Sequence, residues 1–94
     1  ILGVMDIMVE RNAFGRQKES FEADLNIPVL GDKPFKGVFI RAPVIRDIGP
    51  NVKSLCKLDE TIVAAQQYNM IGVSFHPELT NDTRLHQYFL KILL

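Results

Sequence analysis

The sequence holds 94 residues, and its eleven basic and eleven acidic side chains give a formal net charge of zero. This balance, with Lys and Arg scattered along the chain, speaks against nucleic-acid and membrane partners, and no apolar stretch approaches the roughly 20 residues that span a bilayer. A hydrophobic share of 47% excludes a disordered chain, so we predict one small globular domain.

The chain opens inside an apolar segment, residues 2–9, which we predict to be a largely buried strand interrupted by Asp6. It has neither an initiator Met nor the basic region and cleavage site of a signal peptide, so we expect a segment of a longer protein. Residues 10–17 mix charges with a glycine and a phenylalanine, which favours a functional loop.

Further strands follow from alternating or continuous apolar patterns. A half-exposed strand is predicted at 20–25, a turn at 31–34, and a short buried strand at 37–40 that ends at Arg41 before Pro43 stops it. A turn at 48–51 precedes an alternating strand at 52–58, and the turn at 59–60 leads into a hairpin of 61–67 and 70–75 around Tyr68 and Asn69.

The last segment predicts a helix over 84–94, with a cap region at 80–82. Its apolar residues recur at the helical period and should lie against a sheet: Leu85, Tyr88, Phe89, Ile92 and Leu93. In such a strand-rich segment, one closing helix covers one sheet face and leaves another face uncovered, so we expect something to pack against that face.

The candidate catalytic residues are His76 and Glu78, which stand two apart after a predicted strand. Two such residues point to the same side of extended backbone, so the carboxylate can accept a hydrogen bond from one imidazole nitrogen. The other nitrogen is then a general base for a nucleophile, and Pro77 fixes the backbone between them.

This spacing alone leaves two other interpretations open. His76 and Glu78 can be an ordinary surface pair at a strand–helix junction. They can also be imagined, with His86, as a metal site of two histidines and one carboxylate, although an exposed helix face accounts more simply for His86. We predict no metal and no cofactor.

Three segments of the chain together resemble class I glutamine amidotransferases. Residues 73–79, Val-Ser-Phe-His-Pro-Glu-Leu, look like the His–Glu segment of that class. Residues 11–17 with 20–22, and residues 39–43, look more specifically like the glutaminase subunit of the two-protein pyridoxal 5′-phosphate synthase. The resemblance covers nearly the whole chain.

The resemblance implies a fold and a set of residue roles. The fold would be the C-terminal part of a three-layer α/β sandwich, with residues 1–94 forming one portion of a single glutaminase domain. His76 would be the general base and acid and Glu78 its orienting partner, while Arg11, Ile40 and Arg41 would line the site for glutamine. An Arg guanidinium suits the carboxylate of that substrate.

The resemblance also implies partners and a location. L-glutamine would be hydrolysed to glutamate and ammonia, and the ammonia would pass to the pyridoxal 5′-phosphate synthase subunit for vitamin B6 biosynthesis. A single cysteine excludes an internal disulfide framework and fits a reducing compartment, so we predict a cytoplasmic protein.

One part of the family pattern is absent from these 94 residues. The nucleophile of this class sits in a Gly-x-Cys-x-Gly turn, whereas Cys56 lies in an alternating strand without glycine. We therefore predict a structural, unactivated Cys56, no glutamine hydrolysis by this chain alone, and an N-terminal half of the domain as a further partner. A non-catalytic binding module, or a glutaminase serving another synthase, remains an alternative.

Overall fold

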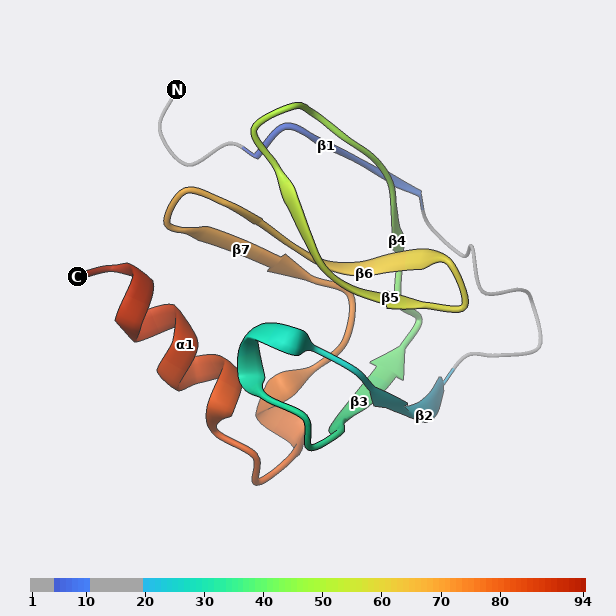
Figure 1. The fold of residues 1–94 in the computed structure, drawn as a ribbon. Helices are drawn as coiled ribbons and strands as arrows, with labels where there is room; N and C mark the ends of the chain where they lie inside the picture. The colour runs from blue at the N-terminus through green and yellow to red at the C-terminus, as the bar shows by residue number, and fades with distance from the viewer. Residues whose placement is uncertain (1–4, 11–19) are drawn as a thin grey trace.

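The computed structural model describes residues 5–10 and 20–94, which form two antiparallel sheets and a closing helix (Figure 1). The larger sheet contains β1 (Ile7–Glu10), β4 (Val44–Ile48), β6 (Thr61–Gln67) and β5 (Lys53–Leu58) in that spatial order, and β7 (Met70–Val73) also pairs with β6. The smaller sheet pairs β2 (Ser20–Leu25) with β3 (Phe35–Ile40). Two short 3-10 helices, η1 (Pro28–Leu30) and η2 (Pro77–Leu79), and the helix α1 (Arg84–Ile92) connect or follow these strands. The strand-rich α/β class with one closing helix is thus confirmed for the described part of the chain.

Several predicted elements form for the reasons given by the sequence. β2 alternates between exposed and less exposed side chains, as its period-two pattern indicates. β6 and β7 form the expected hairpin, with Ala64 paired to Val73 and Gln67 paired to Met70. Tyr68 adopts a φ of 55° in the connecting turn, which provides the left-handed backbone that such a tight reversal needs.

The N-terminal strand differs from the prediction. β1 occupies only Ile7–Glu10, residues 1–4 lie outside the described residues, and its side chains are mostly exposed, Met8 by 60% and Val9 by 51%. The physical reason is its position at the end of the strand order, where it pairs with β4. An apolar run alone does not distinguish a central strand from one at the end of a sheet.

The strands on either side of Pro43 also correct the prediction. β3 alternates where a continuously buried strand was expected, because its outer face is open to solvent and leaves Ile40 44% exposed. β4 was not predicted at all. This strand begins directly after Pro43, and the charged Arg46 and Asp47 obscure the burial of Val44 and Ile45 in its sequence pattern.

The main hydrophobic core joins residues from both sheets and the helix. Phe35 and Phe39 from β3, Val63 from β6 and Phe75 after β7 are at most 3% exposed. The Phe75 ring lies 5.7 Å from the Phe35 ring and 5.8 Å from the Phe39 ring, in tilted and edge-on contacts. Each such buried aromatic side chain stabilises the fold by about 2–3 kcal/mol, so the chain enters the His76 segment from a rigid anchor.

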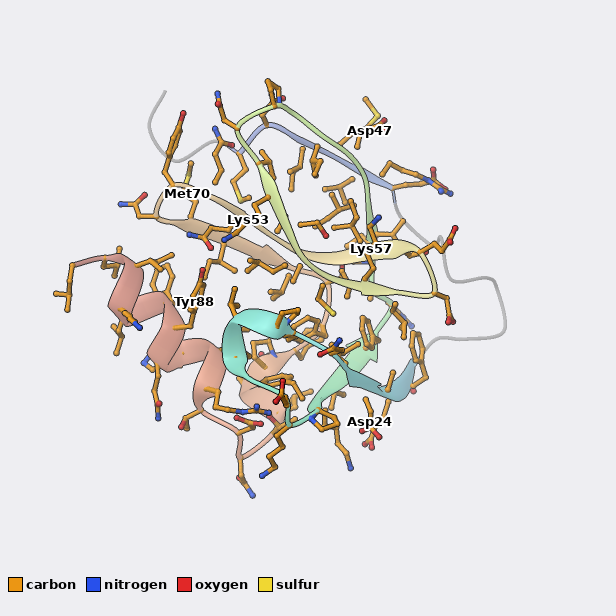
Figure 2. All side chains as sticks on the ribbon, in the orientation of Figure 1. Asp24, Asp47, Lys53, Lys57, Met70 and Tyr88 are labelled. Carbon is orange, nitrogen blue, oxygen red and sulfur yellow. The ribbon has the colours of Figure 1, made fainter. Side chains whose placement is uncertain are left out.

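Helix α1 packs on this core through its first turns. Leu85 is buried, and the Tyr88 hydroxyl donates a hydrogen bond of 2.5 Å to Gln66 Oε1 on β6. Figure 2 shows Tyr88 lying between α1 and the larger sheet. Phe89 and Leu93, expected on the same apolar face, remain 36% and 49% exposed. Among the helices of residues 5–10 and 20–94, none has the length and apolar character needed to cross a membrane.

Candidate active site

The segment that follows β7 passes from the larger sheet to the smaller one. The Ser74 amide donates to the Val63 carbonyl over 2.9 Å, and Phe75 inserts into the core. The His76 amide then donates to the Val38 carbonyl of β3 over 2.7 Å. These contacts place the His76 backbone against β3. The position of the backbone that carries the imidazole is therefore determined by β6 and β3 together.

His76 and Glu78 form the contact that the sequence predicts. The His76 Nδ1 atom lies 2.9 Å from Glu78 Oε2. The backbone differs from the expected extended form, because η2 begins directly after His76 and the Leu79 amide donates to the His76 carbonyl over 3.1 Å. Pro77 occupies the first position of this turn, where its missing N–H costs nothing. We name His76 and Glu78 the His–Glu dyad.

The charge of Glu78 determines which ring nitrogen of neutral His76 carries the proton. The hydrogen bond with His76, followed by a backbone hydrogen bond, holds the pKa of the Glu78 carboxyl below its ordinary value, so Glu78 is ionised at neutral pH. An ionised carboxylate only accepts hydrogen bonds, and neutral imidazole must therefore carry its proton on Nδ1. Nε2 keeps its lone pair, and the His76 side chain is 40% exposed, so a nucleophile can reach this base.

The predicted substrate-binding residues Ile40 and Arg41 lie at the end of β3. Val38, whose carbonyl holds His76, precedes Ile40 by two positions on the same strand. Arg41 adopts a φ of 47°, an unusual left-handed backbone for a residue other than glycine, and its side chain is exposed. Ile40 and Arg41 thus lie at the end of the strand to which the His76 backbone is bonded, whereas Arg11 lies outside the described residues.

The surroundings of Cys56 do not suit a nucleophilic thiol. It lies on β5, is 3% exposed and packs in the main hydrophobic core. Burial raises the pKa of the Cys56 thiol to about 11, so the thiol stays protonated at neutral pH. This agrees with the structural role predicted from its alternating strand.

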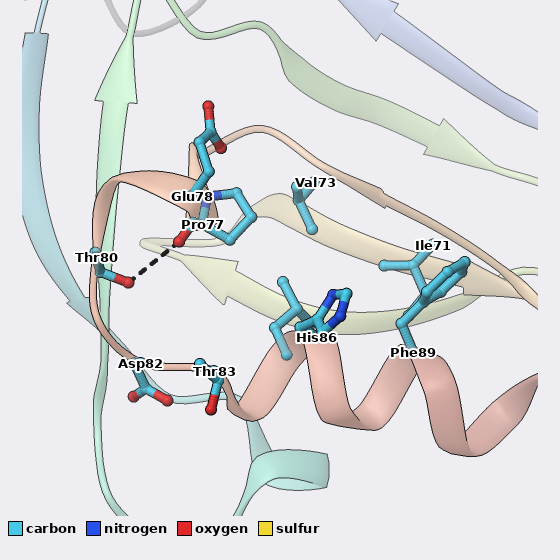
Figure 3. A pocket seen from close by; sticks show the side chains of 10 residues that line it. Ile71, Val73, Pro77, Glu78, Thr80, Asp82, Thr83, His86 and Phe89 are labelled. Carbon is cyan, nitrogen blue, oxygen red and sulfur yellow. Dashed lines mark hydrogen bonds between the residues drawn. The ribbon is translucent and has the colours of Figure 1, made fainter.

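An open cavity of about 480 Å³ lies between β7, η2 and α1 (Figure 3). Its walls are mainly apolar and include Ile71 and Val73 from β7 and Phe89 from α1. Glu78 and His86 both line it. No group of three His, Cys, Asp or Glu side chains within residues 5–10 and 20–94 is placed to hold a metal ion, so the alternative metal site with His86 does not form there.

Sequence reasoning missed an ion pair that follows the dyad. Asp82 and Arg84 lie at the start of α1, and the Arg84 Nη2 atom is 2.7 Å from Asp82 Oδ2. The available signal was an Asp two residues before an Arg at a helix start. It did not reveal the further partners of Arg84, which are backbone carbonyls some 50 positions earlier.

Comparisons with known proteins confirm the resemblance seen in the sequence. The model of the SNO glutamine amidotransferase family matches residues 1–94. The chain is 61% identical over 92 residues to the pyridoxal 5′-phosphate synthase subunit PdxT of Desulforamulus reducens, covering 98% of this chain and 49% of that protein. The PdxT of Methanosarcina acetivorans is 56% identical over 94 residues, covering all of this chain and 47% of that protein.

A solved structure described as a glutamine amidotransferase shares the same fold. It superimposes with a TM-score of 0.89 at 54% identity, covering 97% of this chain and 47% of that chain. The chain therefore spans about half the length of the curated relatives and of the solved structure that it matches.

Proposed function

This chain belongs to the SNO glutamine amidotransferase family, and from that membership we propose that residues 1–94 form the C-terminal portion of a glutaminase domain. The domain would hydrolyse L-glutamine to glutamate and ammonia. The observation that carries the proposal is the 2.9 Å contact between His76 Nδ1 and Glu78 Oε2, which leaves Nε2 as an accessible base.

In the proposed reaction, His76 moves the protons and a cysteine supplies the nucleophile. Nε2 takes the proton of a cysteine thiol, and the sulfur attacks the side-chain amide carbon of glutamine. The carbon–nitrogen bond then breaks, and His76 returns the proton to the leaving ammonia. His76 next deprotonates a water molecule, whose oxygen attacks the thioester, and the thiolate leaves and regains a proton as glutamate is released.

The nucleophile is proposed to come from polypeptide outside these 94 residues. Cys56 is buried in the core and its pKa is raised to about 11, so it meets neither the exposure nor the acidity that catalysis by a thiolate needs. Glu78 would hold the imidazole through the developing positive charge. Arg41 and Ile40, with Arg11, would contribute to the pocket for the substrate.

The ammonia is proposed to pass to a partner. The matched relatives are named as a subunit of pyridoxal 5′-phosphate synthase. On that basis we propose that the partner is the subunit of the same synthase that receives ammonia, and that both work in the cytoplasm. No cofactor is required by the proposed hydrolysis, because its steps are proton transfers and acyl transfer.

A chimera tests this function directly. The 94 residues replace the matching segment of the Desulforamulus reducens relative, and glutamate release is measured with and without the synthase subunit of that organism. We expect hydrolysis by the chimera, a loss of at least about a thousand-fold in kcat for His76→Asn, and activity within two-fold, roughly, for Cys56→Ala.

The same experiment decides between the glutaminase and a non-catalytic binding module. The buried, protonated Cys56 is the observation that favours the module, because these residues contain no other thiol. A folded chimera that binds glutamine without hydrolysing it would support the module. Hydrolysis that persists in His76→Asn would contradict the role assigned to the dyad.

A further inference from the structure

The His–Glu dyad is exposed, so its own burial does not hold it in place. The side chains of His76 and Glu78 are 40% and 65% exposed. Catalytic groups nevertheless need a fixed geometry, because displacement by about 1 Å can lower the rate roughly a hundred-fold. The support must therefore come from the backbone on either side of η2.

On the N-terminal side, β3 supplies that support. Phe75 is anchored between Phe35 and Phe39, and the His76 amide is bonded to the Val38 carbonyl. Within the turn, both the amide and the hydroxyl of Thr80 donate to the Pro77 carbonyl over 3.3 Å. These two bonds close the turn at Thr80. The contacts at the C-terminal end of the segment begin at Asp82.

On the C-terminal side, the Arg84 guanidinium gathers acceptors from two segments. Nε donates to both oxygens of Asp82 at 3.0 and 3.1 Å, and Nη2 donates to Asp82 Oδ2 at 2.7 Å. Nη1 donates to the carbonyls of Leu30 at 3.3 Å and Lys33 at 2.9 Å, and Nη2 donates to that of Pro34 at 3.1 Å. We name the Arg84 side chain, the Asp82 carboxylate and these three carbonyls the Arg84 clasp.

The clasp uses every donor of the guanidinium. Arginine has five N–H groups, and each of them has an acceptor in the clasp. The side chains of Arg84 and Asp82 are only 23% and 22% exposed, and the guanidinium carbon lies 5.8 Å from the centre of the Phe35 ring. A saturated guanidinium has no donor left for substrate, so a direct binding role is excluded and a structural or positioning role remains.

The location of the three carbonyls shows which parts of the fold the Arg84 clasp connects. Leu30, Lys33 and Pro34 form the entry to β3, and Val38 lies farther along that strand. β3 and its entry thus hold both ends of residues 76–82, through Val38 at the start and through Arg84 and Asp82 at the end. Phe35 contacts both Arg84 and Phe75, which joins the two supports.

We propose that Arg84 and Asp82 are positioning residues, which hold the η2 turn on β3 so that Glu78 stays within hydrogen-bonding distance of His76. This inference rests on the proposed glutaminase function for its kinetic consequence, whereas its structural consequence is independent of activity. The substitution Arg84→Lys keeps the positive charge but replaces the planar guanidinium with a compact ammonium group that has three donors. This group cannot bridge Asp82 and the three carbonyls at once.

The first experiment observes the imidazole proton in the 94-residue chain. Long-range ¹H–¹⁵N NMR spectra at about pH 8.5, where an ordinary imidazole is neutral, report which ring nitrogen carries the proton, and His76→Asn assigns the signal. We expect the Nδ1–H form in the unaltered chain and a shift toward the Nε2–H form in Arg84→Lys and in Asp82→Asn.

Two control variants separate the clasp from general loosening. Tyr88→Phe removes the bond between α1 and Gln66 but leaves the clasp intact, and Arg46→Lys disturbs the bidentate Glu10–Arg46 pair on β1 and β4. Neither should change the imidazole signal. A folded Arg84→Lys or Asp82→Asn that keeps the Nδ1–H form overturns the proposal, as does an equal change in Tyr88→Phe. If Arg84→Lys does not fold, Asp82→Asn carries the test.

The second experiment measures kinetics in the chimera. Arg84→Lys should lower kcat by about ten-fold or more and change KM less than about three-fold, because the substrate pocket at the end of β3 is retained. A rise in KM with unchanged kcat overturns the positioning role. An inactive chimera with an imidazole signal that still depends on Arg84 would refute the proposed function and leave the clasp standing.

Discussion

Within the described residues, the His–Glu dyad and Cys56 are held in place in opposite ways. The His–Glu dyad stands on an exposed turn, where the His76 amide donates to the Val38 carbonyl of β3 and the preceding Phe75 packs against two aromatic rings of that strand. Cys56 lies in the middle of a sheet strand, buried in the core and held there by packing. The same protein thus provides an accessible base with an ionised partner and an inaccessible thiol without one.

The two sites differ in how far water reaches them and in the pKa shifts that follow. Water reaches His76, and Glu78 stays charged because its pKa is held below the ordinary value by the His76 hydrogen bond. Cys56 is only 3% exposed, and burial raises the pKa of its thiol to about 11. The surroundings thus leave an exposed imidazole beside an ionised carboxylate at the turn, and a packed, protonated thiol in the strand.

The largest expected contrast is in thiol reactivity. A rise of the thiol pKa from 9.0 to about 11 lowers the thiolate fraction near neutral pH about a hundred-fold, before limited access is considered. We expect Cys56 to react with iodoacetamide at least about a hundred-fold more slowly in the folded chain than in the chain unfolded in urea. Equal rates, measured by mass spectrometry while circular dichroism confirms folding, would contradict the inert thiol.

A smaller effect should follow from neutralising the dyad's carboxyl. Glu78→Gln keeps the size of the side chain but removes the charge that orients the imidazole, so kcat in the chimera should fall by about ten-fold or more. Because the side chain is 65% exposed, the stability that this carboxylate adds is small, and we expect only a small fall in the thermal unfolding midpoint. Unchanged kcat in a folded variant would show that Glu78 does not orient His76.

The sequence reveals some of this arrangement and conceals the rest. The hairpin of β6 and β7 was predictable because its alternation and its Tyr68–Asn69 turn are local features. The dyad was predictable because His76 and Glu78 are near neighbours. β4 was hidden by Arg46 and Asp47, and the clasp was hidden because Arg84 binds backbone carbonyls, which every residue carries and no side-chain pattern marks.

The smallest predicted effect concerns the pKa of the Glu78 carboxyl. Glu78 should titrate below the ordinary 4.5 in a ¹³C NMR titration, and the lowering should diminish in His76→Asn, which removes its first cause. A carboxyl with a lowered pKa in the folded state adds stability above its unfolded pKa, and that stability is lost as the pH falls through the folded value. The pKa of Glu10 is lowered chiefly by the hydrogen bond of its carboxyl with Arg46. This pKa should be the same in His76→Asn as in the unaltered chain.

The position of the glutamyl thioester in the chimera shows directly which cysteine is the nucleophile. Rapid acid quenching after mixing with glutamine, followed by peptide mass spectrometry, locates the modified cysteine. We expect the adduct on a cysteine of the segment contributed by the Desulforamulus reducens relative, and its loss in His76→Asn. A glutamyl adduct on Cys56 would refute the assignment of the nucleophile to polypeptide outside these 94 residues.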